Sequence, residues 1–175
     1  MMKQVLHPIM EFSRPLEVAR VPNLGSHEKI TADARECNAL AKRFQVPKIH
    51  AISAELKAKS WRGGGMKISG LAFMDVDQES VVSLETFRSQ MSVPVERYFL
   101  NIPKGEENES EHDIDPIENG VIDLGEVVAE TIALELDPYP RMKDEAFTAV
   151  IEDDPANDEK KPSPFNVLKL RPDKA

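Results

Sequence analysis

Apolar and polar residues alternate over much of the first hundred positions of the chain. In residues 48–59 every second position from Ile52 onward is apolar. Residues 66–77 repeat this alternation, and the glycine-rich segment 60–65 separates the two stretches. A period of two is typical of a half-buried strand, so the pair predicts a β-hairpin with a long turn. Shorter strands are predicted at residues 11–18, 29–31, 80–87 and 93–100.

Two segments change to helical spacing and begin with a capping signal. The first begins at Asp33, three residues before Glu36, which is the spacing of a capping box, and a Val-Pro pair ends it. The second begins at Asp123, where Glu126 completes the same motif, and Pro138 ends it. Each segment has one apolar stripe, so each is expected to pack one face against the strands.

This order of elements predicts an α+β fold, because the strands follow one another as hairpins and do not alternate with helices. We expect an antiparallel β-meander with two capped helices in a single domain over residues 10–141. Residues 104–119 hold seven acidic side chains, which favours a disordered loop inserted in this domain. Residues 142–175 are expected to form a loosely ordered acidic tail with a short apolar cluster at residues 165–170.

Charge is distributed unevenly along the chain. The net charge is −9, but residues 1–103 carry +3 and residues 104–175 carry −12. The acidic balance argues against indiscriminate nucleic-acid binding, so no DNA partner is expected, yet the first part has room for a basic face. Cys37 is the single cysteine, and the sequence shows neither a secretory signal nor an apolar run long enough to span a membrane. A cytoplasmic protein is therefore expected.

The sequence lacks the signatures of the common reaction types. Residues 63–65 are three glycines, but no helical pattern follows them, so they do not form a phosphate-binding loop. The four histidines are far apart and lack a second ligand at helical spacing, so no metal site is expected. The carboxylates near the second helix are explained by capping and by a solvated face. We therefore expect no catalytic residue, no metal, no cofactor and a non-enzymatic function.

Basic residues beside the glycine-rich turn are the first candidates for binding. Cations next to an exposed aromatic residue can bind phosphates and stack on unpaired bases, which indicates RNA binding. The alternative is an ordinary solvated sheet face whose lysines discourage edge pairing, and composition alone favours it. The candidate RNA-binding residues are Lys57, Lys59, Trp61, Arg62 and Lys67 around the predicted hairpin, and Arg35, Lys42 and Arg43 on the outer face of the first helix.

Five segments together resemble a known family. They are "IMEFSRPLEVARV", "ITADARECNALAKRFQVPKIHAISAEL", "ISGLAFMDVDQESVVSLETF", "GVIDLGEVVAETIALELDPYPR" and "PFNVLKL". Their order and spacing resemble the YceD-like family of large ribosomal RNA subunit accumulation proteins, and most of all its alphaproteobacterial branch. The family's Asp-Leu-x-Glu segment matches Asp123, Leu124 and Glu126. Many members carry a cysteine where this chain has Ser80, so no metal or redox role is carried over.

The resemblance implies a role in the synthesis, processing or stability of 23S rRNA and in assembly of the large ribosomal subunit. The expected partner is 23S rRNA or a pre-50S particle. An alternative is a protein-interaction module whose acidic loop and tail bind basic ribosomal proteins. The loop could either recruit such a protein or mask the basic face. Tyr139 and Arg141, just past the second helix, are the candidate residues for contact with a partner.

Overall fold

The computed structural model describes residues 11–101, 114–143 and 145. The strands of these residues form a five-stranded sheet and a smaller two-stranded sheet. The large sheet has the order β2-β3-β4-β5-β6, and the small one pairs β1 with β7. The strands are β1 (Pro15–Glu17), β2 (Ser26–Thr31), β3 (Lys48–Trp61), β4 (Gly65–Glu79), β5 (Thr86–Leu100), β6 (Ile114–Pro116) and β7 (Val121–Asp123).

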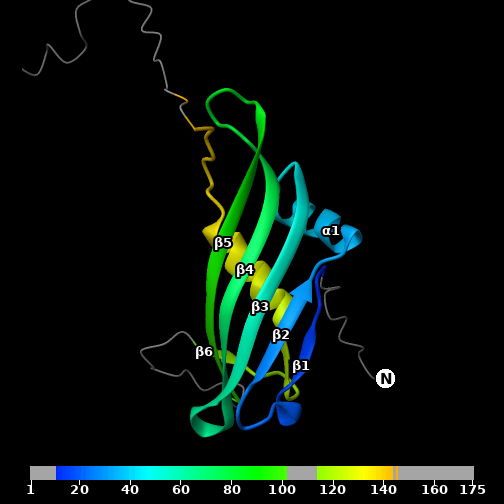
Figure 1. Cartoon of the computed structure of the whole chain (residues 1–175), viewed down its shortest axis with the longest axis vertical. Helices are drawn as coiled ribbons and strands as arrows, with labels where there is room; N and C mark the ends of the chain where they lie inside the picture. The colour runs from blue at the N-terminus through cyan, green and yellow to red at the C-terminus, as the bar shows by residue number, and fades with distance from the viewer. Residues whose placement is uncertain (1–10, 102–113, 144, 146–175) are drawn as a thin grey trace, which may run out of the picture. The chain divides into compact units, whose positions relative to one another are not determined.

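Two α-helices pack on one face of the large sheet. They are α1 (Ala34–Phe44) and α2 (Leu124–Glu135), and α2 crosses behind the strands in Figure 1. Two short 3₁₀ turns, η1 (Val18–Arg20) and η2 (Arg62–Gly64), complete the elements of the described residues. The predicted α+β class is confirmed. The large sheet is antiparallel except at β6, which pairs with β5 in parallel.

The core lies between the sheet and the helices. The period of two in β3 and β4 buries one row of side chains, including Ile52 and Ile68, while the other row faces away from the helices. Leu40 of α1 and Val128 and Ile132 of α2 are fully buried against that row. Cys37 of α1 is also buried, and burial raises the pKa of its thiol. The opposite face of the sheet carries no helix of the described residues.

The strand predicted at residues 80–87 is wrong, because residues 80–85 form the turn between β4 and β5. Ser80 is buried, and its hydroxyl accepts hydrogen bonds from the N–H groups of Val82 and Ser83. Leu84 has a left-handed φ of 61°. Local hydrogen bonds to a serine side chain compete with strand pairing, and here they stabilise a turn in place of a strand.

The strand predicted at residues 93–100 is longer than expected, since β5 begins at Thr86. Pro94 lies within it and has no N–H to donate. Beyond Tyr98–Leu100, where β6 pairs, β5 forms the edge of the sheet among the described residues. The proline therefore faces an unpaired edge, where its missing donor costs no ladder hydrogen bond.

The predicted disorder of residues 104–119 is wrong for their last part. Ile114–Pro116 form β6, and Ile117 is only 8% exposed in the core. Residues 102–113 lie outside the described part of the chain, as do residues 146–175, which hold most of the predicted tail. The predicted division between domain and tail at residue 141 stays a prediction.

The two predicted capping boxes have different outcomes. Asp33 accepts hydrogen bonds from the N–H groups of Arg35 and Glu36, and the Glu36 carboxylate accepts from the Asp33 N–H, so the first box is confirmed. Asp123 caps α2 as predicted. The Glu126 carboxylate, however, is bound by both terminal guanidinium nitrogens of Arg43. Glu126 therefore joins α2 to α1, a contact that local spacing cannot reveal.

Arg14 forms a second link between segments that are distant in sequence. Its guanidinium donates to both Glu36 oxygens, at 2.7 and 2.9 Å, and to the Thr31 carbonyl at 2.8 Å. These hydrogen bonds hold the pKa of Glu36 below its usual range. The chain before β1 is thereby fixed to the start of α1.

We expect Glu36→Gln to lower the free energy of unfolding by about 1–2 kcal/mol at pH 7, because it removes a charged hydrogen-bond acceptor. A carboxylate with a depressed pKa contributes stability above its unfolded pKa, near 4.5, and loses it as pH falls through the folded value. The gap between variant and wild type should therefore narrow below about pH 4.5 in urea titrations across this range.

Glu85→Gln is the matched control for this pH dependence. The exposed Glu85 carboxylate forms no ion pair with any side chain of the described residues. This variant should follow the wild-type stability curve throughout. A gap for Glu36→Gln that stayed constant with pH would contradict the role of the Arg14 hydrogen bonds.

Candidate RNA-binding surface

The turn between β3 and β4 gathers the predicted hairpin residues at one end of the large sheet. Gly63 and Gly64 have φ values of 61° and 78°, a region that side-chain-bearing residues rarely adopt. A Cβ on Gly65 would lie 2.3 Å from the Phe99 carbonyl oxygen. The three glycines thus allow a tight turn whose backbone approaches β5 closely.

Strand register places like charges directly opposite each other next to this turn. Lys59 of β3 pairs with Lys67 of β4, and Lys67 pairs with Tyr98 of β5. Lys57 lies on the same face as Lys59 and pairs with the exposed His27 of β2. Like charges facing each other across strands destabilise a sheet. The opposed pair Lys59 and Lys67 therefore makes no favourable contribution of its own to strand pairing.

Aromatic rings lie among these cations. The ring centroids of Trp61 and Tyr98 are 4.9 Å apart with an interplanar angle of 53°. The Arg62 guanidinium carbon lies 5.6 Å from the Trp61 ring centroid, and the Lys67 nitrogen lies 5.0 Å from that of Tyr98. Such distances are those of cation–π contacts. The surface therefore combines two π systems with two positive charges at its centre.

Within the part of the chain that the structure describes, only one of these cations is joined to a carboxylate. Lys67 lies 3.2 Å from Glu96, which also accepts a hydrogen bond from the Tyr98 hydroxyl. Hydrogen bonding to Tyr98 and then to Glu96 raises the pKa of the Lys67 ammonium above its ordinary value. No ion pair within residues 11–101 and 114–143 involves Lys57, Lys59 or Arg62. Their charges can therefore interact with an incoming anion.

The three predicted cations of α1 do not join this surface. The helix packs on the opposite face of the sheet, through Leu40 and its buried neighbours. Arg43 lies 2.6 Å from Glu126 and 3.2 Å from Glu11, and the hydrogen bonds to Glu126 raise its pKa. Arg35 and Lys42 are exposed on α1. The eight candidates thus divide into a hairpin group and a helix group.

We call the surface around the β3–β4 turn the hairpin surface. It contains five residues that the sequence predicted and two that it did not predict. Tyr98 and His27 were missed. Alternation in residues 93–100 places Tyr98 on the same face as Glu96, so its position on the outer face of the sheet was readable from the sequence. Its position beside Trp61 depends on the register between β4 and β5. The surface consists of Lys57, Lys59, Trp61, Arg62, Lys67, His27 and Tyr98.

The predicted partner-contact residues lie at the other end of the sheet. Tyr139 is 69% exposed, and Arg141 is exposed as well. Between them, the Pro140 carbonyl accepts a hydrogen bond of 3.0 Å from the Val81 N–H in the β4–β5 turn. The backbone of this segment is therefore anchored to that turn while both side chains face solvent.

Within the described residues, no group of three or more His, Cys, Asp or Glu side chains could hold a metal ion. Neither helix of that part of the chain is long and apolar enough to cross a membrane.

Comparison with known proteins identifies the family. A family model described as large ribosomal RNA subunit accumulation protein YceD matches residues 69–171. The chain belongs to the YceD family. The family's description connects it with accumulation of the RNA of the large ribosomal subunit. The matched range includes Tyr98, but it begins two residues after Lys67, the last basic residue of the hairpin surface. No curated protein matches the chain, and no solved structure does.

Proposed function

We propose that this protein supports accumulation of 23S rRNA by binding it, or a pre-50S particle that contains it, through the hairpin surface. The observation that carries the proposal is the opposed pair Lys59 and Lys67 beside the rings of Trp61 and Tyr98. Membership of the YceD family supports the link to large-subunit RNA. A role of this kind acts in the cytoplasm, where ribosomes are assembled.

Binding would use the two kinds of group that the surface offers. Lysine and arginine side chains neutralise phosphates, and aromatic faces stack on unpaired bases. Single-stranded or looped RNA presents both at once, whereas a regular RNA duplex hides its bases. We therefore propose contact with unpaired segments of 23S rRNA, and protection of those segments during assembly without catalysis of a reaction. The few cations imply affinity that falls steeply with salt.

Reversing two charges of the hairpin surface tests the proposal. Lys57→Glu with Lys59→Glu should lower affinity for a purified 23S rRNA fragment by about tenfold or more, because two phosphate contacts are replaced by repulsion. The same variant should no longer retain 23S rRNA during purification from cells. Filter binding at several salt concentrations measures the affinity, and the salt dependence should become shallower.

Arg35→Glu with Lys42→Glu is the matched control, because it changes the net charge equally on the helix side of the sheet. This variant should keep the wild-type affinity within about twofold. Equal losses in both double variants would indicate a general charge effect and would contradict the hairpin surface. Circular dichroism shows whether both variants remain folded.

A further inference from the structure

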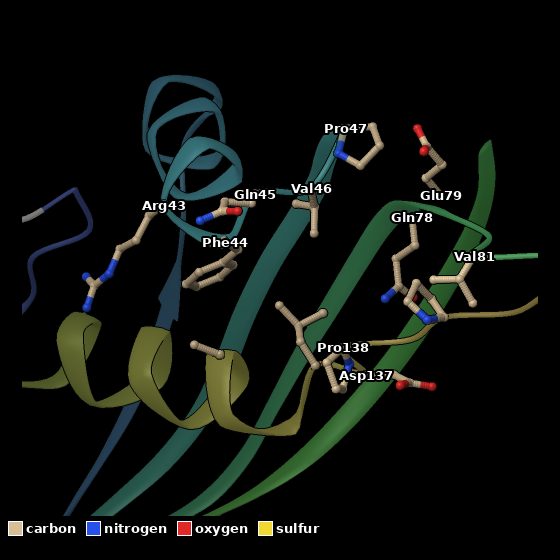
Figure 2. A pocket seen from close by; sticks show the side chains of 13 residues that line it. Arg43, Phe44, Gln45, Val46, Pro47, Gln78, Glu79, Val81, Asp137 and Pro138 are labelled. Carbon is tan, nitrogen blue, oxygen red and sulfur yellow. The ribbon is translucent and has the colours of Figure 1, made fainter. Parts of the chain in front are cut away.

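A groove of about 840 Å³ opens between the ends of the two helices and the β4–β5 turn (Figure 2). Val46 lies on one side of it, after α1, and Val81 lies on the other side, in the turn. The end of α2 and the segment after it complete the wall. Its apolar lining includes Phe44, Val46, Val81, Ala133, Leu136 and Pro138.

The groove also has a negatively charged rim. Glu79 at the end of β4 and Asp137 after α2 both line it and are exposed. Arg43 lines it too, but its guanidinium is bound by Glu11 and Glu126. The electrostatic character of the open groove is therefore set by the two carboxylates.

The C-terminus of α2 adds to this negative potential. A helix C-terminus carries partial negative charge and is stabilised by cations. The last turn of α1 has Lys42 and Arg43, as this rule predicts, whereas the last turn of α2 has no basic residue. Glu135 and Asp137 stand there, where their charges are unfavourable. A positively charged ligand would remove that repulsion.

We propose that this groove binds an apolar peptide segment of another protein that carries lysine or arginine side chains. The apolar lining would cover the segment's hydrophobic residues, and the rim with the end of α2 would pair with its cations. RNA is disfavoured, because its phosphates would meet Glu79 and Asp137. A second copy of this chain is disfavoured as well, because its net charge of −9 opposes the same rim.

This inference is independent of the proposed RNA binding, because the two sites lie at opposite ends of the sheet. Pro47 lines the groove just before β3, and Trp61 ends β3 at the hairpin surface. A strand of 14 residues spans about 45 Å at about 3.3 Å per residue. A basic protein and an RNA segment could therefore bind at the same time.

Two labelled peptides and a matched pair of variants test the groove. The probes are a short fluorescent peptide of leucine, proline and lysine, and a counterpart with glutamate in place of lysine. Fluorescence anisotropy with the full chain should show binding of the lysine peptide only. Ala133→Arg should weaken it by about tenfold, because the new side chain fills the groove and adds a cation there. Leu134→Arg, which adds the same charge at a neighbouring exposed position outside the lining, should leave it within about twofold.

A structural readout complements these affinities. In methyl-labelled protein, the lysine peptide should shift the NMR signals of Val46, Val81 and Leu136. The signal of Leu71, which is exposed on the opposite face of the sheet, should not move. Shifts confined to the methyl groups of these three residues would support the assignment.

Several results would overturn the proposal. If the glutamate peptide bound as tightly as the lysine peptide, the acidic rim would have no role in binding. If Ala133→Arg and Leu134→Arg lowered the peptide affinity equally, the peptide would bind outside the groove. A wild-type dimer that Ala133→Arg dissociates would make a second copy the occupant. Loss of 23S rRNA affinity in Ala133→Arg, but not in Leu134→Arg, would make the groove a nucleic-acid site.

Discussion

Replacing Gly125 by alanine should destabilise the fold by about 3 kcal/mol, although helix propensity alone favours alanine by about 1 kcal/mol. A Cβ on Gly125 would lie 2.3 Å from the carbonyl oxygen of Phe12 and 2.8 Å from its carbonyl carbon. The fully buried Phe12 holds that backbone in the core, so it cannot withdraw without loss of packing. Urea denaturation followed by far-UV circular dichroism measures the change, and its sign alone distinguishes the two effects.

Gly120→Ala is the control for this prediction. Gly120 has a φ of 74°, and a Cβ there would meet no described atom within 4 Å. This substitution should cost only about 1 kcal/mol, through backbone strain. A stabilising or neutral effect of Gly125→Ala would show that the segment containing Phe12 does not approach α2 as closely as the structure indicates.

Local patterns predicted the elements whose stabilising contacts are themselves local. The first helix begins where the spacing of Asp33 and Glu36 placed it, because a capping box needs only residues three apart. The β3–β4 hairpin follows from two alternating stretches and a glycine-rich turn. In both cases neighbouring residues carry the physical signal.

Elements that depend on distant partners were mistaken or missed. Residues 80–87 were predicted as a strand, whereas the turn there is fixed by the Ser80 hydroxyl, which accepts from the Val82 N–H and donates to Glu145. The acidic residues around β6 made this segment resemble a disordered loop. Ile114 stabilises it only through pairing with β5, and Ile117 only through burial in the core. Such contacts have no signature in the local sequence.

In the candidate site as well, local contacts were predictable from the sequence and contacts between distant residues were not. Adjacency to the turn correctly grouped Lys57, Lys59 and Trp61 in one region, because a hairpin keeps sequence neighbours close. The register that adds Tyr98, and the packing that places α1 behind the sheet, are tertiary properties. The groove is formed by three separate segments, so no single stretch of sequence could predict it.

Asp123→Ala should lower the free energy of unfolding by about 3 kcal/mol, because one carboxylate joins α2 to the chain before β1. Its Oδ1 accepts hydrogen bonds from the N–H groups of Gly125, Glu126 and Arg14, at 2.9, 3.3 and 2.8 Å. Its Oδ2 accepts from the Ser13 hydroxyl. Loss of an N-cap costs about 1 kcal/mol, and each partly buried donor left without a partner adds to it. Urea denaturation at pH 7 measures the loss.

Asp123→Asn separates this structural role from a functional one. Asparagine is also a good N-cap, and its carbonyl can keep all three N–H contacts, so its cost should be only about 1 kcal/mol. An asparagine variant as unstable as the alanine variant would contradict the capping geometry. Both variants, while folded, should bind 23S rRNA like the wild type, because Asp123 is not part of the hairpin surface. With Leu124 in the core and Glu126 joined to Arg43, the Asp-Leu-Gly-Glu segment then acts by fixing α2 in place.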